Sequence, residues 1–149
     1  MRLVFEYCCN GSLKEYLNSN IISNESELLN MLKELSEGLH FLHKDFRNEN
    51  ENKRAPIAHR DLKSENILFF NSNRLVICDF AMSTQIQQYQ YGSNHQQQVG
   101  TPRYMSPEIL VSTIGCEEGS LLKCDVYALG IIFWEVLSRF DFQSKFNWF

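Results

Sequence analysis

The sequence has no excess of positive charge, no long hydrophobic run and no signal peptide. Its formal net charge is −4, which gives no basic surface of the kind that binds nucleic acid, so no nucleic-acid partner is expected. The longest apolar run, VYALGIIFW, is stopped by Glu135 and is too short to span a bilayer. The first residues lack the apolar core of a secretion signal. We therefore expect a soluble, intracellular chain.

Regular cysteine spacing, internal repeats and a domain boundary are absent as well. The five cysteines are an odd number without a paired metal-binding spacing, and two of them lie in apolar surroundings. This pattern predicts buried, reduced thiols in a cytosolic domain. A length of 149 residues predicts one domain or a piece of a larger one, and a hydrophobic content of 44% is sufficient for a sizeable core.

The apolar pattern predicts a helical body with a small β-hairpin on its surface. One helix is indicated by leucines at steps of three and four: Leu28, Leu32, Leu35, Leu39 and Leu42. Asn24 followed by Glu27 resembles a capping box at its start. The runs 66–70 and 75–80 predict two strands around the turn NSN. Residues 124–137 are apolar on nearly every face, which predicts a helix in the middle of the core.

The remaining segments predict short elements and loops. Residues 2–7 read as a short strand, NGS as a turn and residues 13–17 as a helical turn or two. Residues 44–54 are polar and charged, which is typical of a solvated loop. The segment 85–98 holds seven glutamines and little that can pack, so we expect a mobile loop there.

The segment AHRDLKSENIL concentrates the residues that can carry chemistry. Asp61 can accept a proton, whereas the Asn66 carboxamide can only coordinate a metal or form hydrogen bonds. Lys63 would lie on the same side as Asp61 in extended backbone and can hold a phosphate. The hairpin folds Asp79 back toward Asn66, and these two oxygen ligands suit Mg²⁺ shared with substrate phosphates.

Taken together, these residues resemble the signature set of the protein kinases. HRDLKSEN matches the pattern H-R-D-L-x-x-x-N, and DFA matches two of the three residues of D-F-G. VGTPRYMSPE resembles the end of an activation segment, with SPE in place of A-P-E. The resemblance implies an α+β protein-kinase-like fold, of which this chain would hold the mostly helical large lobe with a short β-hairpin. The small lobe would be missing and the C-terminal helices truncated.

The resemblance also assigns roles to single residues. Asp61 and Lys63 would be catalytic, and Asn66 and Asp79 would hold Mg²⁺ or Mn²⁺ on ATP. FEYCCNGSL resembles the hinge between kinase lobes, with Phe5 as gatekeeper. The nucleotide-binding set would be Glu6, Cys8, Ser12, Lys63, Asn66, Leu68 and Asp79, with the Glu6 carbonyl and the Cys8 amide on adenine, Ser12 near the ribose and Leu68 beneath the base. Lys63 and Thr101 are typical of the serine/threonine class.

Three further roles follow from the same match. Asp125 would bind the backbone around His59 and Arg60, and Phe80 would pack toward His59. Arg60 would meet a phosphate or carboxylate on the activation segment. Candidate phosphate acceptors in that segment are Ser83, Thr84 and Ser93, among which the sequence does not choose.

Four longer segments resemble the receptor serine/threonine kinases of the transforming growth factor-β superfamily: FEYCCNGSLKEYL, APIAHRDLKSENIL, VGTPRYMSPEIL and KCDVYALGIIFWEVLSR. The type II branch, and the bone morphogenetic protein type II receptors most closely, provides the best match. This implies a plasma-membrane receptor whose kinase domain is cytoplasmic and whose membrane span lies outside this chain. Its activity would be transfer of the ATP γ-phosphate to protein serine or threonine, with a type I receptor kinase as substrate.

The match has gaps that favour an alternative. No glycine-rich loop or V-A-I-K lysine precedes the hinge, so the isolated chain is expected to show no phosphotransfer. Glu108 would lack the arginine that pairs with it in kinases, and Ala81 would be strained at a positive φ that suits glycine. Residues 1–139 would be a partial kinase domain, and 140–149 an atypical tail from a truncated gene model. The alternatives are a pseudokinase-like fragment or binding module, or a fragment that associates through its exposed inter-lobe face.

Overall fold

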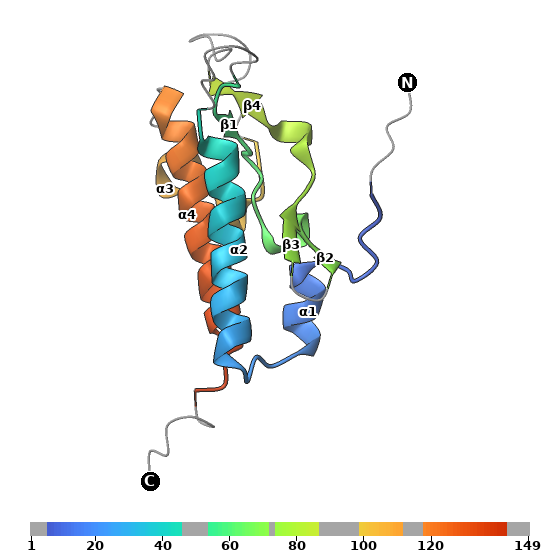
Figure 1. The fold of residues 1–149 in the computed structure, drawn as a ribbon. Helices are drawn as coiled ribbons and strands as arrows, with labels where there is room; N and C mark the ends of the chain where they lie inside the picture. Colours follow the sequence, from blue (N-terminus) through green and yellow to red (C-terminus); the bar gives the residue numbers. More distant parts are fainter. Residues whose placement is uncertain (1–5, 46–53, 72–73, 87–98, 112–117, 143–149) are drawn as a thin grey trace.

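The computed structural model describes residues 6–45, 54–71, 74–86, 99–111 and 118–142. Two long helices dominate it, α2 (Glu25–His43) and α4 (Glu118–Leu137), which lie side by side and run in opposite directions (Figure 1). The leucine stripe predicted for α2 is confirmed in four positions. Met31 is buried where Leu32 was expected and Leu32 is half-buried, because a helix of 3.6 residues per turn rotates slightly away from a strict three-four repeat.

The start of α2 differs from the predicted capping box. Asn24 is the N-cap, but its side chain accepts from the Ser26 amide at 2.9 Å. The Glu27 carboxylate turns away from the cap and accepts a hydrogen bond from the Tyr16 hydroxyl. A complete capping box lies instead on α1 (Leu13–Ser19), where the Ser12 hydroxyl accepts from the Glu15 amide and the Glu15 carboxylate accepts from the Ser12 amide.

The predicted hairpin is present as β2 (Ile67–Asn71) and β3 (Arg74–Ile77), antiparallel with Leu68 opposite Val76. It packs against α2 mainly through β3 and is flanked on its other side by α1 (Figure 1). The second strand ends at Ile77 and does not continue to residue 80 as predicted. The side chains of the hairpin that point inward join the hydrophobic core: Ile67 and Phe69 from β2 and Leu75 from β3.

A second, shorter pairing joins β1 (Ile57–Ala58) to β4 (Thr84–Gln85), also antiparallel. It connects the chain just before residue 59 to the chain just after residue 83. The remaining elements are single turns: η1 (Ser64–Asn66), η2 (Phe80–Met82), η5 (Pro102–Tyr104) and α3 (Pro107–Leu110). Gln85, the first residue of the predicted glutamine-rich loop, therefore lies in a strand, whereas residues 87–98 lie outside the described residues. Of the strand predicted at 2–7, residues 2–5 lie outside the described residues, and Glu6 and Tyr7 are not in a strand.

Helix α4 is longer at its start than predicted, and among the described residues only part of its surface is buried. One stripe is buried, which includes Leu121, Ala128, Ile132 and Val136. The opposite face is exposed among the described residues, with Trp134 at 66% and Val126 at 55%. The prediction of a helix in the middle of the core was wrong for this face, because apolar composition alone does not say how many neighbours a helix has. After α4 the chain returns to Ile22 through two backbone hydrogen bonds, and Phe140 is buried.

The described cysteines are free thiols as predicted, but they are not buried. Cys8, Cys9, Cys78 and Cys124 are free thiols, but none of the four is buried; Cys9 is exposed and the others are half-buried. Cys116 lies outside the described residues. No helix in the described ranges is long and apolar enough to cross a membrane.

The capping box of α1 generates a stability prediction. Ser12→Ala removes the side-chain cap and one partner of Glu15, and we expect it to lower the free energy of unfolding by about 1 kcal/mol. Ser19→Ala, the same change at the exposed end of α1, is the matched control and should change it little. Urea unfolding of both variants measures this; equal effects would contradict the assigned cap.

Candidate active site

The segment from His59 to Asn66 is held in place by a buried carboxylate from α4. Asp125, only 2% exposed, accepts hydrogen bonds from the backbone amides of His59 at 2.7 Å and Arg60 at 2.9 Å. The His43 ring, at the end of α2, lies 3.0 Å from the same carboxylate and must donate to it. The predicted role of Asp125 is confirmed, and His43 is an additional partner that the sequence reasoning missed.

The His59 side chain ties this segment to the chain that follows β3. Its Nε2 donates to the Cys78 carbonyl at 2.9 Å, and its ring meets the Phe80 ring edge-on with centroids 5.1 Å apart. The predicted packing of Phe80 toward His59 is confirmed. His59 is completely buried, and its Nδ1 has no hydrogen-bonding partner among the described residues. The ring therefore acts as a fixed spacer between the two segments that carry Asp61 and Asp79.

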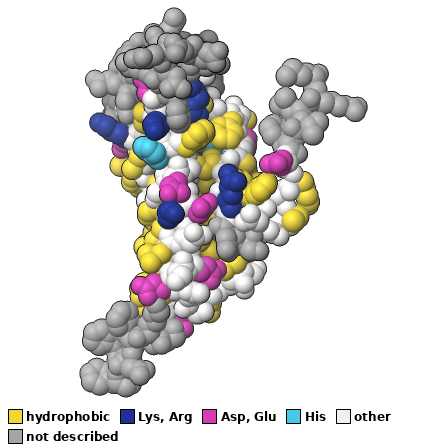
Figure 2. All heavy atoms as spheres, viewed as in Figure 1, with side chains coloured by type: hydrophobic (Ala, Val, Ile, Leu, Met, Phe, Trp, Pro, Cys, Tyr) yellow, Lys and Arg dark blue, Asp and Glu magenta, His cyan; other side chains and the backbone are white. Residues whose placement is uncertain are grey.

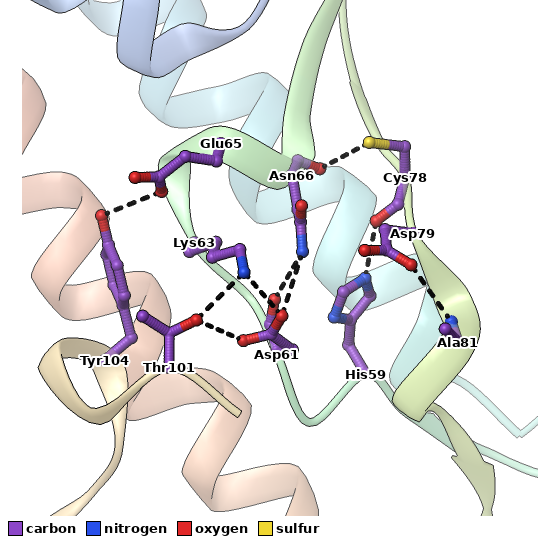
Figure 3. A network of polar contacts seen from close by, with 10 residues as sticks. All are labelled: His59, Asp61, Lys63, Glu65, Asn66, Cys78, Asp79, Ala81, Thr101 and Tyr104. Atoms are coloured by element: carbon purple, nitrogen blue, oxygen red, sulfur yellow. Dashed lines mark hydrogen bonds and ion pairs between the residues drawn. The ribbon is translucent and has the colours of Figure 1, made fainter. Parts of the chain in front are cut away.

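Asp61, Lys63 and Thr101 form a closed triangle (Figure 3). Lys63 Nζ donates to Asp61 Oδ2 at 2.8 Å and to Thr101 Oγ1 at 3.0 Å, while Thr101 Oγ1 donates to Asp61 Oδ1 at 2.8 Å. Burial alone would raise the pKa of Asp61, but the hydrogen bonds from Lys63 and Thr101 outweigh it, so the pKa lies below its ordinary value. Asp61 therefore remains a carboxylate at neutral pH.

Asn66 directly precedes β2 and Asp79 follows the end of β3 by two residues, so the hairpin brings their segments together as predicted. The Cys78 amide donates to the Asn66 carbonyl at 2.9 Å, which brings the two segments together directly before Asp79. The Asn66 amide nitrogen donates to the Asp61 carbonyl at 2.9 Å, which leaves the carboxamide oxygen available (Figure 3). Asp79 is exposed and uses one carboxylate oxygen to accept from the Ala81 amide at 3.4 Å.

This donor set fits the divalent cation implied by the resemblance. Mg²⁺ binds hard oxygen ligands, takes few of them from protein and completes its shell with phosphate and water. The Asp79 carboxylate and the Asn66 carboxamide oxygen are ligands of that kind. No cluster of three His, Cys, Asp or Glu side chains suited to a transition metal occurs in the part of the chain that the structure describes.

The strain predicted at Ala81 is absent. The non-glycine residues with positive φ in the described ranges are Arg60 at 69° and Asp79 at 62°. Ala81 lies inside η2, a right-handed turn that any residue adopts. The prediction was wrong because the chain makes its left-handed turn at Asp79 itself, before the position where kinases have glycine.

The residues predicted to bind the nucleotide base lie at the N-terminal edge of the fold. Glu6 is exposed, Cys8 is half-buried, and Phe5 lies outside the described residues. Ser12 and Leu68 are neighbours through an isolated β-bridge, which brings the hinge segment against β2. The Ser12 hydroxyl serves as the N-cap of α1, a role that the sequence reasoning did not foresee. The nucleotide contacts of these four residues stay predictions.

A buried polar network beside the triangle was also missed. The Tyr104 hydroxyl donates to Glu135 at 2.9 Å and lies 3.0 Å from the Ser64 hydroxyl, while Lys14 and Arg103 approach the Glu135 carboxylate at 3.6 and 3.8 Å. Burial is the main cause that raises the pKa of Tyr104 to about 12; the hydrogen bond with Ser64 opposes it, and the Glu135 carboxylate adds to it. The signal in the sequence was Glu135 itself, since a lone acid within an apolar helix must find partners.

Gly100, beside Thr101, generates a prediction about the triangle. It has φ 117°, and a Cβ there would lie 2.6 Å from the Arg60 carbonyl oxygen. We expect Gly100→Ala to lower the free energy of unfolding by at least about 1–2 kcal/mol, because the backbone cannot keep this conformation and contact. Gly130→Ala, within α4 and with no atom near its Cβ position, should raise it by up to about 1 kcal/mol. Thermal unfolding of both variants checks this, and a shift of the same sign in both would contradict it.

Comparisons with known proteins agree with this geometry. The family model described as "Protein kinase domain" matches residues 1–146. Activin receptor type-2B of Xenopus laevis is 38% identical over 130 residues, activin receptor type-2A of Rattus norvegicus 36% over 129 and that of Homo sapiens 35% over 129. Each alignment covers 87% of this chain but only 25% of the relative, so the chain spans about a quarter of the length of these receptors. The chain belongs to the protein kinase family.

Proposed function

We propose that this chain is the large-lobe part of a receptor serine/threonine kinase, which transfers the γ-phosphate of ATP to a serine or threonine hydroxyl of a protein. The observation that carries the proposal is the triangle of Asp61, Lys63 and Thr101, because it joins an ionised carboxylate to a cation within 2.8 Å. Similarity to activin type II receptors supports the receptor class.

Each side chain has a task in that reaction. Asp61 would orient the substrate hydroxyl and accept its proton, and its lowered pKa keeps it ionised for this role. Lys63 would stabilise the negative charge on the transferring phosphoryl group. Thr101 currently accepts from Lys63 and donates to Asp61, so it fixes the relative position of both groups at the place where the substrate hydroxyl would arrive.

ATP and Mg²⁺ or Mn²⁺ would be bound on the other side of Asp61. Asn66 and Asp79 would hold the cation, and Glu6, Cys8, Ser12 and Leu68 would contact the adenosine. The bound cation supplies neutralisation of phosphate charge. Asn66 also donates to the Asp61 carbonyl at 2.9 Å, so the same residue that would ligate the cation positions the catalytic loop.

The wider assignment rests on the named relatives. The parent protein would be a plasma-membrane receptor with this domain in the cytoplasm, and its protein substrate would be a type I receptor kinase. Similarity to activin receptor types 2A and 2B supports the type II branch; a specific relation to the bone morphogenetic protein type II receptors is the finer proposal. The alternative of a binding module loses one of its supports, since Ala81 has no positive φ.

A chimeric kinase tests the proposed activity. Residues 1–139 would replace the matched segment of the Xenopus laevis activin receptor type-2B kinase domain, which supplies the rest of the lobes. We expect phosphate transfer from ATP to serine and threonine of a protein substrate, measured by radiolabel incorporation and phosphoamino-acid analysis. Asp61→Asn should reduce it by a factor of at least about 10², because general acid–base catalysis contributes that much.

Matched lysine variants separate chemistry from folding. Lys63→Met should abolish most activity, whereas Lys33→Met, which removes an exposed i,i+4 partner of Glu37, should leave it unchanged. An active chimera that keeps full activity after Asp61→Asn and Lys63→Met would refute the assigned roles. An inactive chimera that is folded by circular dichroism would refute the proposed activity.

A further inference from the structure

One face of α4 is apolar and exposed among the described residues. Its large side chains are Tyr127, Trp134 and Leu137, which are 42%, 66% and 37% exposed. Gly130 is exposed as well, so these positions recur at steps of three and four residues and form one stripe along the helix. Figure 2 shows hydrophobic side chains along the left edge of the surface, where α4 runs in Figure 1. A stripe of this period is the seam along which one helix packs against another.

The stripe carries no charge and points away from the candidate active site. From residue 124 to residue 138 the charged residues are Asp125 and Glu135, and both are buried. Successive helix residues are about 100° apart, so Asp125, which binds the His59 and Arg60 amides, lies nearly opposite the stripe. An uncharged apolar helix face in contact with water favours association with another apolar surface.

The order of side chains along the stripe fits a second copy of the same stripe. In an antiparallel pair of helices related by a two-fold axis, residues at equal distances before and after the axis lie opposite each other. An axis level with Ile132 places Trp134 of one copy opposite Gly130 of the other, and Tyr127 opposite Leu137. Outside the adjacent residues and the helix backbone, no atom of the described chain lies within 4 Å of the Cβ position of Gly130. The indole therefore has room at the glycine, and each large side chain meets a smaller one.

The same register joins opposite charges at the two ends of the stripe. Lys123 is exposed and lies nine residues before Ile132, and Asp141 lies nine residues after it. An antiparallel pair therefore brings each Lys123 near Asp141 of the other copy, which gives two ion pairs. A parallel pair would place the two lysines, and the two Trp134 rings, at the same level. Charge and size both favour the antiparallel pair.

We propose that this face of α4 binds a second copy of the chain, as an antiparallel pair of α4 helices with two-fold symmetry. Trp134 of each copy covers Gly130 of the other, and Lys123 pairs with Asp141 at each end. Glycine at the crossing lets the two backbones approach closely, because it has no side chain. One helix face makes a small interface, so we expect a dissociation constant of about 1–100 μM. The Asp61 triangle stays open, so the pairing can be tested independently of the proposed phosphate transfer.

Sedimentation velocity of the 149-residue chain measures the pairing. Over concentrations from about 1 to 300 μM, we expect the apparent mass to rise from 17.5 kDa to twice that value and to stop there. Trp134→Ser should weaken dimerisation at least about tenfold, because a buried tryptophan commonly dominates an interface. Gly130→Leu should weaken it as much by filling the space of the partner's indole, although leucine favours a helix more than glycine does.

Leu137→Ser and Leu29→Ser form a matched pair of variants. Both remove an exposed leucine from a long helix, but Leu29 lies on α2, outside the stripe. We expect Leu137→Ser to weaken dimerisation at least about threefold, because burial of a leucine is favourable, and Leu29→Ser to leave it unchanged. Circular dichroism checks that both variants stay folded. Equal weakening by the two variants would overturn the proposal.

Charge exchange tests the register of the pair. Lys123→Glu and Asp141→Lys should each weaken dimerisation about 2- to 10-fold, because like charges then face each other. The double variant exchanges the two charges and should restore dimerisation to within about twofold of the unsubstituted chain. A chain that stays monomeric would leave this face to a different protein and overturn the proposal. Growth beyond the dimer, a dimer that Trp134→Ser does not weaken, or a double variant that restores nothing would overturn it as well.

Discussion

The buried carboxylate of Asp125 is the interaction on which the candidate active site depends. It accepts hydrogen bonds from the backbone amides of His59 and Arg60 and from the His43 ring. A single acidic group on α4 is thus bonded to the end of α2 and to the segment that carries His59. Hydrogen bonds to a charged group contribute about 1.5–3 kcal/mol each, and a buried charge that loses its partner costs about 3–5 kcal/mol. These magnitudes are large compared with the stability of a small domain, and they favour one conformation of the loop strongly.

That anchoring explains where the backbone is strained. Arg60 has φ 69°, a conformation that costs a residue with a side chain about 1–2 kcal/mol, and it persists because the Arg60 amide is bound by Asp125 at 2.9 Å. Asp79 has φ 62° and follows the Cys78 carbonyl that His59 binds. Each left-handed residue thus directly follows one partner of the hydrogen bond between the His59 ring and the Cys78 carbonyl: Arg60 follows His59, and Asp79 follows Cys78. Arg60 directly precedes Asp61, whose carboxylate forms the triangle with Lys63 and Thr101.

Much of this could be predicted from the sequence, because the decisive contacts are local or follow a simple period. The leucine repeat located α2, the turn NSN located the hairpin, and the hairpin placed Asn66 beside the segment that carries Asp79. Other features depend on contacts between distant elements. Glu27 left the predicted capping box because Tyr16 of α1 competes for it, and the left-handed turn occurs at Asp79 rather than Ala81 because His59 holds the preceding carbonyl. The exposed face of α4 was not predictable, since composition describes a helix and not its neighbours.

Asp125 is expected to control the order of the segment around His59 and Arg60, and amide hydrogen exchange measures this most directly. In Asp125→Ala, the amides of His59 and Arg60 lose their acceptor, so protection should fall at these residues and at Thr101, which depends on Asp61 for its position. The amides of α2 between Leu28 and Leu39, whose hydrogen bonds lie within the helix, should stay protected. Unchanged protection at His59 and Arg60, with α2 still folded, would contradict the claim that Asp125 holds this loop.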